Sequence, residues 1–178
     1  MKKHTLTDIL NEALMDEYKA RDTYRKIIDT FGPVRPFINI VKAEQRHIEM
    51  LLPLYEKYAI PLPVEPDPER VTVADSLQKA CQMGIEEELT NMAMYDRLIA
   101  AADQPDVIGI LQRLQAASRD HHLPAFQRCA EQRGTQGSDQ GFGGGSSQGT
   151  SRGRGHGMGQ RFGPGQRGFK ARSLFQTE

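Results

Sequence analysis

The sequence predicts an all-α protein, in which a bundle of four helices is followed by a tail of different composition. Apolar residues recur every three or four positions through four stretches before residue 134, the spacing of one helix face. Of the 17 glycines, 14 fall after residue 133. We therefore expect a helical domain over residues 1–133. We expect a Gly/Arg/Ser-rich tail over residues 134–178 to be disordered, because so few apolar residues cannot offset the entropy of ordering.

The first two helices are expected over residues 5–30 and 34–58. Gly32 and Pro33 separate them, since glycine ends helices readily and proline cannot continue one. Pro53 lies within the second stretch, where it removes a backbone hydrogen bond, so we expect a kink near the end of that helix.

The third and fourth helices are expected to follow residue 71. Thr72 with Asp75 three residues later resembles a weak capping box, so the third helix is predicted to begin there. The fourth is predicted to follow Pro105, with Pro124 interrupting its backbone hydrogen bonds.

The connections indicate the topology. Short connections join the first helix to the second and the third to the fourth, so each pair is expected to be antiparallel. The segment 59–71 contains four prolines, and an extended proline-rich chain rises about 3.1 Å per residue, enough here for roughly 40 Å. A 25-residue helix is about 37 Å long. Two antiparallel pairs joined by one long crossover form the connection of ferritin-like bundles.

Three glutamates lie on the apolar faces of their helices rather than at the edges: Glu17, Glu44 and Glu88. A carboxylate in a protein core costs several kcal/mol unless it is paired or bound to a metal. A buried salt bridge, or a bend that exposes the group, would explain one such residue. Three near the middle of three helices predict a shared metal site.

Histidines complete the predicted site. Glu44 and His47 form Glu-x-x-His, which places both on one helix face. In the fourth helix His122 lies on the apolar face and His121 near its edge; we favour His122, although Arg119 stands where a second Glu-x-x-His would need a carboxylate. The predicted ligands are Glu17, Glu44, His47, Glu88 and His122. These donors suit one or two iron ions, with manganese or zinc as alternatives.

Several motifs resemble known families. Residues 17–24 resemble the first-helix E-x-x-A-R-x-x-Y pattern of rubrerythrins, and residues 43–47 their second-helix E-x-x-H. Residues 88–95 are similar to their third-helix E-x-x-E followed by Met-Tyr, with Asn91 in place of the second glutamate. This departure leaves one metal, or an asymmetric pair, as open as a full two-metal site.

A closer resemblance is to a bacterial and archaeal ferritin-like domain family of unknown function. Residues 36–40, 91–96 and 122–126 carry it, and it extends over about residues 5–130. The resemblance implies a four-helix bundle and metal binding, and it supplies no substrate.

Two functions compete at this point. An iron site of this kind would reduce peroxide or oxidise ferrous iron, which makes the protein a rubrerythrin-like non-haem iron oxidoreductase. Alternatively, the bundle is not catalytic, its metal site is structural or degraded, and its Gly/Arg tail binds a partner or RNA. Tyr24 and Tyr95, each seven residues after a predicted ligand, are expected to be core residues with satisfied hydroxyls rather than electron relays.

Charge and hydropathy limit the partners. The tail carries six basic and two acidic residues, so the rest of the neutral chain carries an excess of four negative charges. We therefore expect nucleic-acid binding at most weakly and through the tail. No stretch approaches the roughly 20 apolar residues of a membrane span. We expect a cytoplasmic protein that does not bind membranes, and a homodimer is left open.

Two cysteines are predicted to lie side by side. Cys81 is seven residues before Glu88 and Cys129 seven after His122, so antiparallel helices would bring them to one level. We expect free thiols in a reducing cytoplasm, with a disulfide as the alternative.

Overall fold

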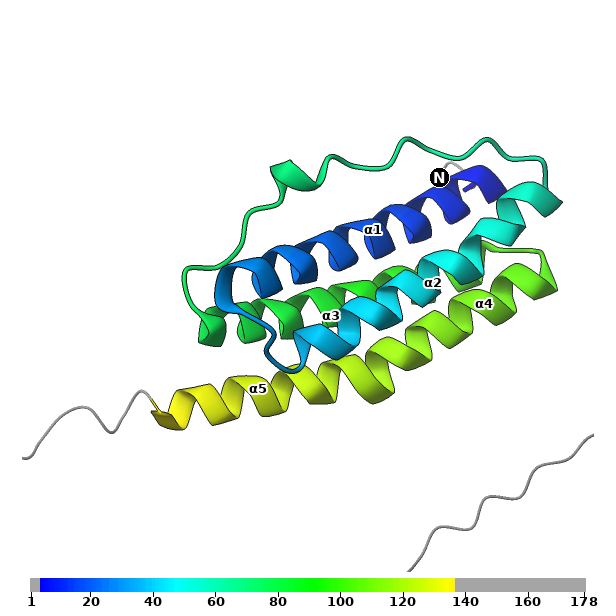
Figure 1. Ribbon diagram of the computed structural model, residues 1–178. Helices are drawn as coiled ribbons and strands as arrows, with labels where there is room; N and C mark the ends of the chain where they lie inside the picture. The colour runs from blue at the N-terminus through cyan, green and yellow to red at the C-terminus, as the bar shows by residue number, and fades with distance from the viewer. Residues whose placement is uncertain (1–3, 137–178) are drawn as a thin grey trace, which may run out of the picture. The chain divides into compact units, whose positions relative to one another are not determined.

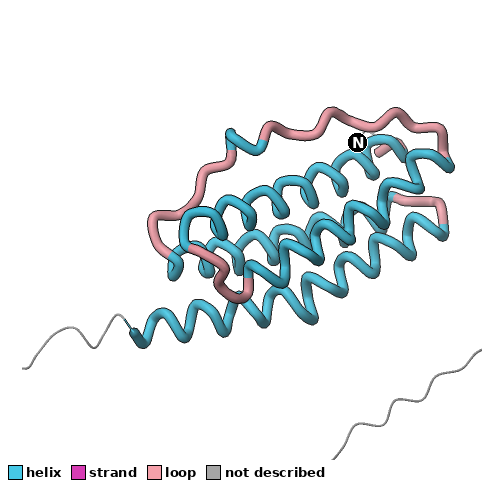
Figure 2. Tube along the Cα trace, in the orientation of Figure 1, coloured by secondary structure: helices cyan, strands magenta, loops and turns pink. Residues whose placement is uncertain are grey.

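The computed structural model describes residues 4–136, and all of the regular structure within this range is helical (Figure 2). The first hairpin pairs α1 (Leu6–Phe31) with α2 (Phe37–Lys57). Thr5 and Asp8 cap α1 reciprocally: the Thr5 hydroxyl accepts from the Asp8 amide at 3.1 Å, and the Asp8 carboxylate accepts from the Thr5 amide at 2.9 Å. Gly32 follows α1 with a φ of 85°, a conformation that favours glycine. Both helices lie close to their predicted positions.

The third helix, α3 (Leu77–Ala101), begins later than predicted. Ser76 caps it, because its hydroxyl accepts a hydrogen bond from the amide of Lys79 at 3.3 Å. Thr72 and Asp75 therefore do not form the predicted capping box and lie before the helix. Ser76, one position after Asp75, can cap a helix as Thr72 can, so composition alone did not distinguish the predicted start of the helix from the observed one.

The last helical rod consists of three parts in series: α4 (Pro105–Ala117), the π-helical turn η2 (Ser118–His122) and α5 (Leu123–Gln136). The predicted interruption is confirmed as this π turn, which ends two residues before Pro124. A π turn has wider hydrogen-bonded rings and accommodates a residue that lacks an amide donor. The end of α5 extends three residues into the predicted tail, whose remainder, residues 137–178, lies outside the described residues.

A long crossover connects the two hairpins, as predicted. It runs along the outside of α1 from the end of α2 to the start of α3 and contains the short helix η1 (Pro68–Arg70) (Figure 1). Arg21, which is buried in α1, forms an ion pair with Glu65 of the crossover. α3 packs against α4 and α5 to form the second hairpin. Within the described part of the chain, every helix is too short or too polar to span a bilayer.

The core consists of two apolar clusters, one toward each end of the bundle. One contains residues from the first half of α1 and the last half of α2, such as Leu14 and Leu51. The other surrounds Tyr24, Phe37 and Phe126. Glu44, His47, Glu88 and His122 fall between the positions that contribute to the two clusters, and Glu17 lies at the edge of the first cluster, next to Tyr18. The polar residues therefore form a layer between two apolar ends.

The two cysteines confirm the predicted register of α3 against α5. Cys81 and Cys129 lie with their Cα atoms 5.8 Å apart. They are joined by a disulfide, so the expectation of free thiols is wrong. The separation lies within the range that a disulfide requires.

Candidate metal centre

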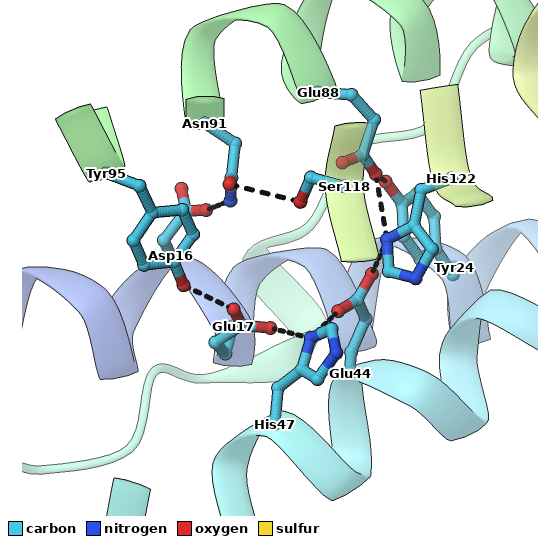
Figure 3. A network of polar contacts seen from close by, with 10 residues as sticks. All are labelled: Asp16, Glu17, Tyr24, Glu44, His47, Glu88, Asn91, Tyr95, Ser118 and His122. Carbon is cyan, nitrogen blue, oxygen red and sulfur yellow. Dashed lines mark hydrogen bonds and ion pairs between the residues drawn. The ribbon is translucent and has the colours of Figure 1, made fainter. Parts of the chain in front are cut away.

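The five residues predicted as ligands converge in the polar layer (Figure 3). α1 supplies one, α2 two, α3 one and the π turn η2 one; they are Glu17, Glu44, His47, Glu88 and His122. Each is at most 8% exposed. Their burial follows from their places on the apolar faces, where helix packing covers them regardless of their polarity.

His47 lies between two carboxylates. Its Nδ1 is 2.8 Å from Oε2 of Glu44, one turn earlier in α2, and 3.1 Å from Oε2 of Glu17 across the helix interface. The Tyr95 hydroxyl donates a hydrogen bond of 2.5 Å to the other oxygen, Oε1, of Glu17. The Glu17 carboxylate is therefore fixed from both sides.

His122 has no such partner, although carboxylates face it. Its Nδ1 lies 3.3 Å from Oε1 of Glu44 and 3.5 Å from Oε1 of Glu88, yet it makes no hydrogen bond within the described residues. The Tyr24 hydroxyl donates to Oε1 of Glu88 at 3.3 Å. The His122 ring stacks against that of His47, with centroids 5.6 Å apart. A buried nitrogen without a partner carries an energetic cost that a bound cation would remove.

Of the two histidines in the π turn, one faces the layer. His122 is buried in it, whereas His121 is exposed. Arg119, at the position where a second Glu-x-x-His would have its carboxylate, is also exposed and pairs with Asp120 at 2.8 Å. The fourth rod therefore contributes one imidazole to the layer.

Burial and mutual proximity perturb the acid–base behaviour of the layer. Burial, reinforced by the charge of Glu17, raises the pKa of Glu44 well above its ordinary range. Burial opposes protonation of His47, but hydrogen bonds and charges from Glu17 and Glu44 outweigh it and raise the pKa of His47 to about 10. Burial alone would raise the pKa of Glu17, but the hydrogen bond and the positive charge of His47 outweigh burial and lower that pKa. The metal-free layer therefore favours protons on Glu44 and His47.

The two tyrosines act as donors to carboxylates. Burial and the adjacent carboxylates raise the pKa of Tyr24 and of Tyr95 well above the ordinary value of 10, so both hydroxyls keep their protons. The expectation of core tyrosines with satisfied hydroxyls is confirmed, and their partners are two predicted ligands.

A second polar chain borders the layer (Figure 3). The amide nitrogen of Asn91 donates to Asp16, and the Ser118 hydroxyl donates to the Asn91 carbonyl at 3.3 Å. Burial, then the charge of Glu17, raises the pKa of Asp16 to about 6. Sequence reasoning assigned no role to Asp16 or Ser118. Ser118 lies on the apolar face of its helix, which could have marked it; Asp16 carries no comparable signal.

The donor atoms are spaced for one cation. One atom each of Glu44, His47 and His122 lies within 4.8 Å of the other two. Opposite ligands of a metal ion with bonds near 2.1 Å are about 4 Å apart, so small side-chain rotations would suffice. Glu17 and Glu88 flank this trio through His47 and His122 respectively. The residues present therefore fit a metal ion.

The chain resembles proteins of unassigned function. Residues 8–79, which include α2, the crossover and nearly all of α1, match the family model of an uncharacterized protein domain, DUF2202. This match confirms the predicted resemblance to a domain family of unknown function. The crystal structure of a hypothetical protein from Methanococcus jannaschii DSM 2661 is similar, with a TM-score of 0.65 and 26% sequence identity. The similarity covers 75% of this chain and 86% of that chain. A comparison with curated proteins found no match.

Proposed function

We propose that this is a ferritin-like metal-binding protein whose buried layer binds iron and uses it to reduce peroxide or to oxidise ferrous iron. The observation that carries the proposal is His122 Nδ1, a buried nitrogen that faces two carboxylate oxygens without a hydrogen bond. Imidazole nitrogens are the commonest metal ligands in proteins, and this one has no competing hydrogen bond within the described residues.

An ion-pair network without metal accounts for part of the layer. His47 forms ion pairs with one oxygen of Glu17 and one oxygen of Glu44, as in a structural salt bridge. At His122 the contacts are looser, because its Nδ1 lies 3.3 Å from Glu44 and 3.5 Å from Glu88 and makes no hydrogen bond to either within the described residues. A cation at this point would bring His122 and both carboxylates into contact with one positive centre.

The donor set favours iron. Glu44, His47 and His122 supply two imidazoles and one carboxylate, the composition typical of non-haem Fe(II) sites. Iron bound in this way keeps open positions and supplies redox chemistry with O₂ or peroxide. Manganese and zinc accept similar donors, so metal analysis is part of the test.

The protein's own groups would orient the carboxylates. Tyr95 holds Glu17 at 2.5 Å and Tyr24 holds Glu88 at 3.3 Å. Hydrogen bonds of this kind fix the direction of ligand lone pairs and strengthen metal binding. The ferritin-like assignment is supported by the topology, in which two helical hairpins and one long crossover bring carboxylates from three helices to one level.

The proposal is tested by metal content and then by turnover. The full chain, expressed in iron-supplied medium, should contain about one to two equivalents of iron, the capacity of such carboxylate bundles. Glu44→Ala should lose most of this metal. Glu49→Ala is the matched control, because Glu49 is an exposed glutamate of the same helix. Consumption of hydrogen peroxide and oxidation of Fe²⁺ are then measured on the loaded protein.

The outcomes separate the two functions. Metal lost in Glu44→Ala and kept in Glu49→Ala, together with peroxide or ferrous turnover, supports the proposal. Stoichiometric metal without turnover supports a structural site. A wild-type protein that binds no iron, or a Glu44→Ala variant with full metal content, overturns the site.

A further inference from the structure

A narrow pocket reaches the polar layer from the side of α1 and α3. Its walls include Lys19, Ala20 and Thr23 of α1 and Glu87 of α3, and it extends to Glu44 and Glu88. The cavity has a volume of about 30 Å³. Ala20, which has a small side chain, is part of its lining, and α1 packs more closely against α2 than against α3.

The two ends of the pocket differ in exposure. At the outer end Lys19 and Glu87 form an ion pair of 2.8 Å, and their side chains are 57% and 48% exposed. At the inner end Glu44 and Glu88 are 3% and 4% exposed. The pocket therefore extends from half-exposed residues to two of the predicted ligands, and the ion pair belongs to its exposed end.

Size and charge restrict what could enter. Pockets for drug-sized organic molecules occupy roughly 300–1,000 Å³, so this one has room only for species of about the size of one or two waters. Carboxyl groups outnumber the single ammonium along its walls, with Asp16 joining the three glutamates against Lys19. Such a lining favours cations and neutral molecules over anions.

We infer, resting on the proposed metal site, that this pocket is the passage through which a divalent cation and a molecule no larger than peroxide reach Glu44 and Glu88. Lys19 and Glu87 gate its mouth, and Ala20 sets its width. The passage excludes organic substrates, which restricts the chemistry of the site to metal ions, O₂ and peroxides of minimal size.

The test uses Co²⁺, whose visible absorption reports binding, and the full chain freed of metal by chelation. Ala20→Leu places a larger side chain in the passage and leaves every predicted ligand residue unchanged. We expect Co²⁺ loading and chelator-driven release to slow about tenfold each, because a close-packed interior leaves little room to move aside. A barrier slows entry and exit equally, so the equilibrium affinity should stay within about threefold of the wild type.

The matched control is Ala100→Leu, at an exposed alanine of α3 away from the passage, which should load at the wild-type rate. Lys19→Ala removes the ion pair at the mouth and one positive charge from the passage. It should load Co²⁺ about two- to fivefold faster, the effect expected for a single charge near the surface. This variant tests the passage independently, even where Ala20→Leu disturbs folding.

The rates of Co²⁺ exchange in these variants decide whether the pocket is the passage. Slower exchange in Ala20→Leu at unchanged affinity, with faster loading in Lys19→Ala, supports the passage. Loading of Ala20→Leu at the control rate, or of Lys19→Ala no faster than the wild type, overturns the passage and leaves the metal site intact. A wild-type protein that binds no Co²⁺ overturns the metal site and the passage together.

Discussion

The Gly84→Ala variant should be less stable than the Gly109→Ala variant. Both glycines lie inside helices, Gly84 in α3 and Gly109 in α4. A Cβ added at Gly84 would lie 2.6–2.8 Å from three ring atoms of Phe126, whereas one added at Gly109 would meet nothing within 4 Å. Phe126 is fully buried and packs against Tyr24 and Phe37, with centroids 5.4 and 5.5 Å away.

The magnitude follows from two opposing terms. Alanine stabilises a helix interior by about 0.5–1 kcal/mol relative to glycine, because glycine loses more entropy on folding. Overpacking a close-packed core costs about 1–3 kcal/mol. Gly109→Ala should therefore gain about 0.5–1 kcal/mol, since only the first term applies. The free energy of unfolding of Gly84→Ala should be about 1–3 kcal/mol lower than that of Gly109→Ala, because Phe126 has to move to make room for the added Cβ.

Urea unfolding of the two variants and the wild type, followed by circular dichroism, measures both free energies. The slopes of the transitions should agree, so that the midpoints report stability alone. Equal stabilisation of Gly84→Ala and Gly109→Ala would refute the close approach of α3 to Phe126. The metal content of Gly84→Ala is measured as well, because Phe126 contacts Tyr24, whose hydroxyl donates a hydrogen bond to Glu88.

Three further predictions concern the disulfide and the polar layer. Replacing Cys81 and Cys129 together by serine should lower the free energy of unfolding by up to about 4 kcal/mol, the loop entropy for a separation of 48 residues, as measured by denaturant titration. Tyr95→Phe leaves an oxygen of Glu17 without its donor and should cost the metal-free protein about 1–3 kcal/mol in the same assay. The folded pKa of His47, about 10, lies above its ordinary 6.5, so its contribution to stability is complete below pH 6.5 and is lost as the pH rises to about 10. Thermal melting of the metal-free protein across this range should therefore show a declining midpoint, and His47→Gln should flatten the decline.

Helix periodicity was sufficient to predict the residues of the layer, because burial in a bundle depends on the face and not on the side chain. Glu17, Glu44 and Glu88 share a face with leucines and isoleucines, so packing those apolar residues buries the glutamates as well. The proline-rich crossover was predictable for a similar reason: its composition and length leave few other paths between two hairpins.

Features that depend on local geometry were harder to predict. The π turn adds a residue to one turn of the last rod, a step that helical periodicity does not contain, although the periodic pattern already favoured His122 over His121. The start of α3 depended on which of several candidate capping side chains accepts a hydrogen bond from a backbone amide of the first turn. Asp16 enters the polar chain through Asn91, a contact across 75 positions of sequence that no local pattern encodes.

The polar layer is consistent with either protons or a metal ion as its source of positive charge. Three carboxyl groups are almost fully buried, so their charge has to be compensated locally. In the metal-free protein, the raised pKa of Glu44 and of His47 means that each favours a bound proton. One divalent cation that displaces these two protons leaves the net charge of the layer unchanged. The exchange therefore requires no new charge in the core, and a cation would also give His122 Nδ1, which makes no hydrogen bond within the described residues, a partner.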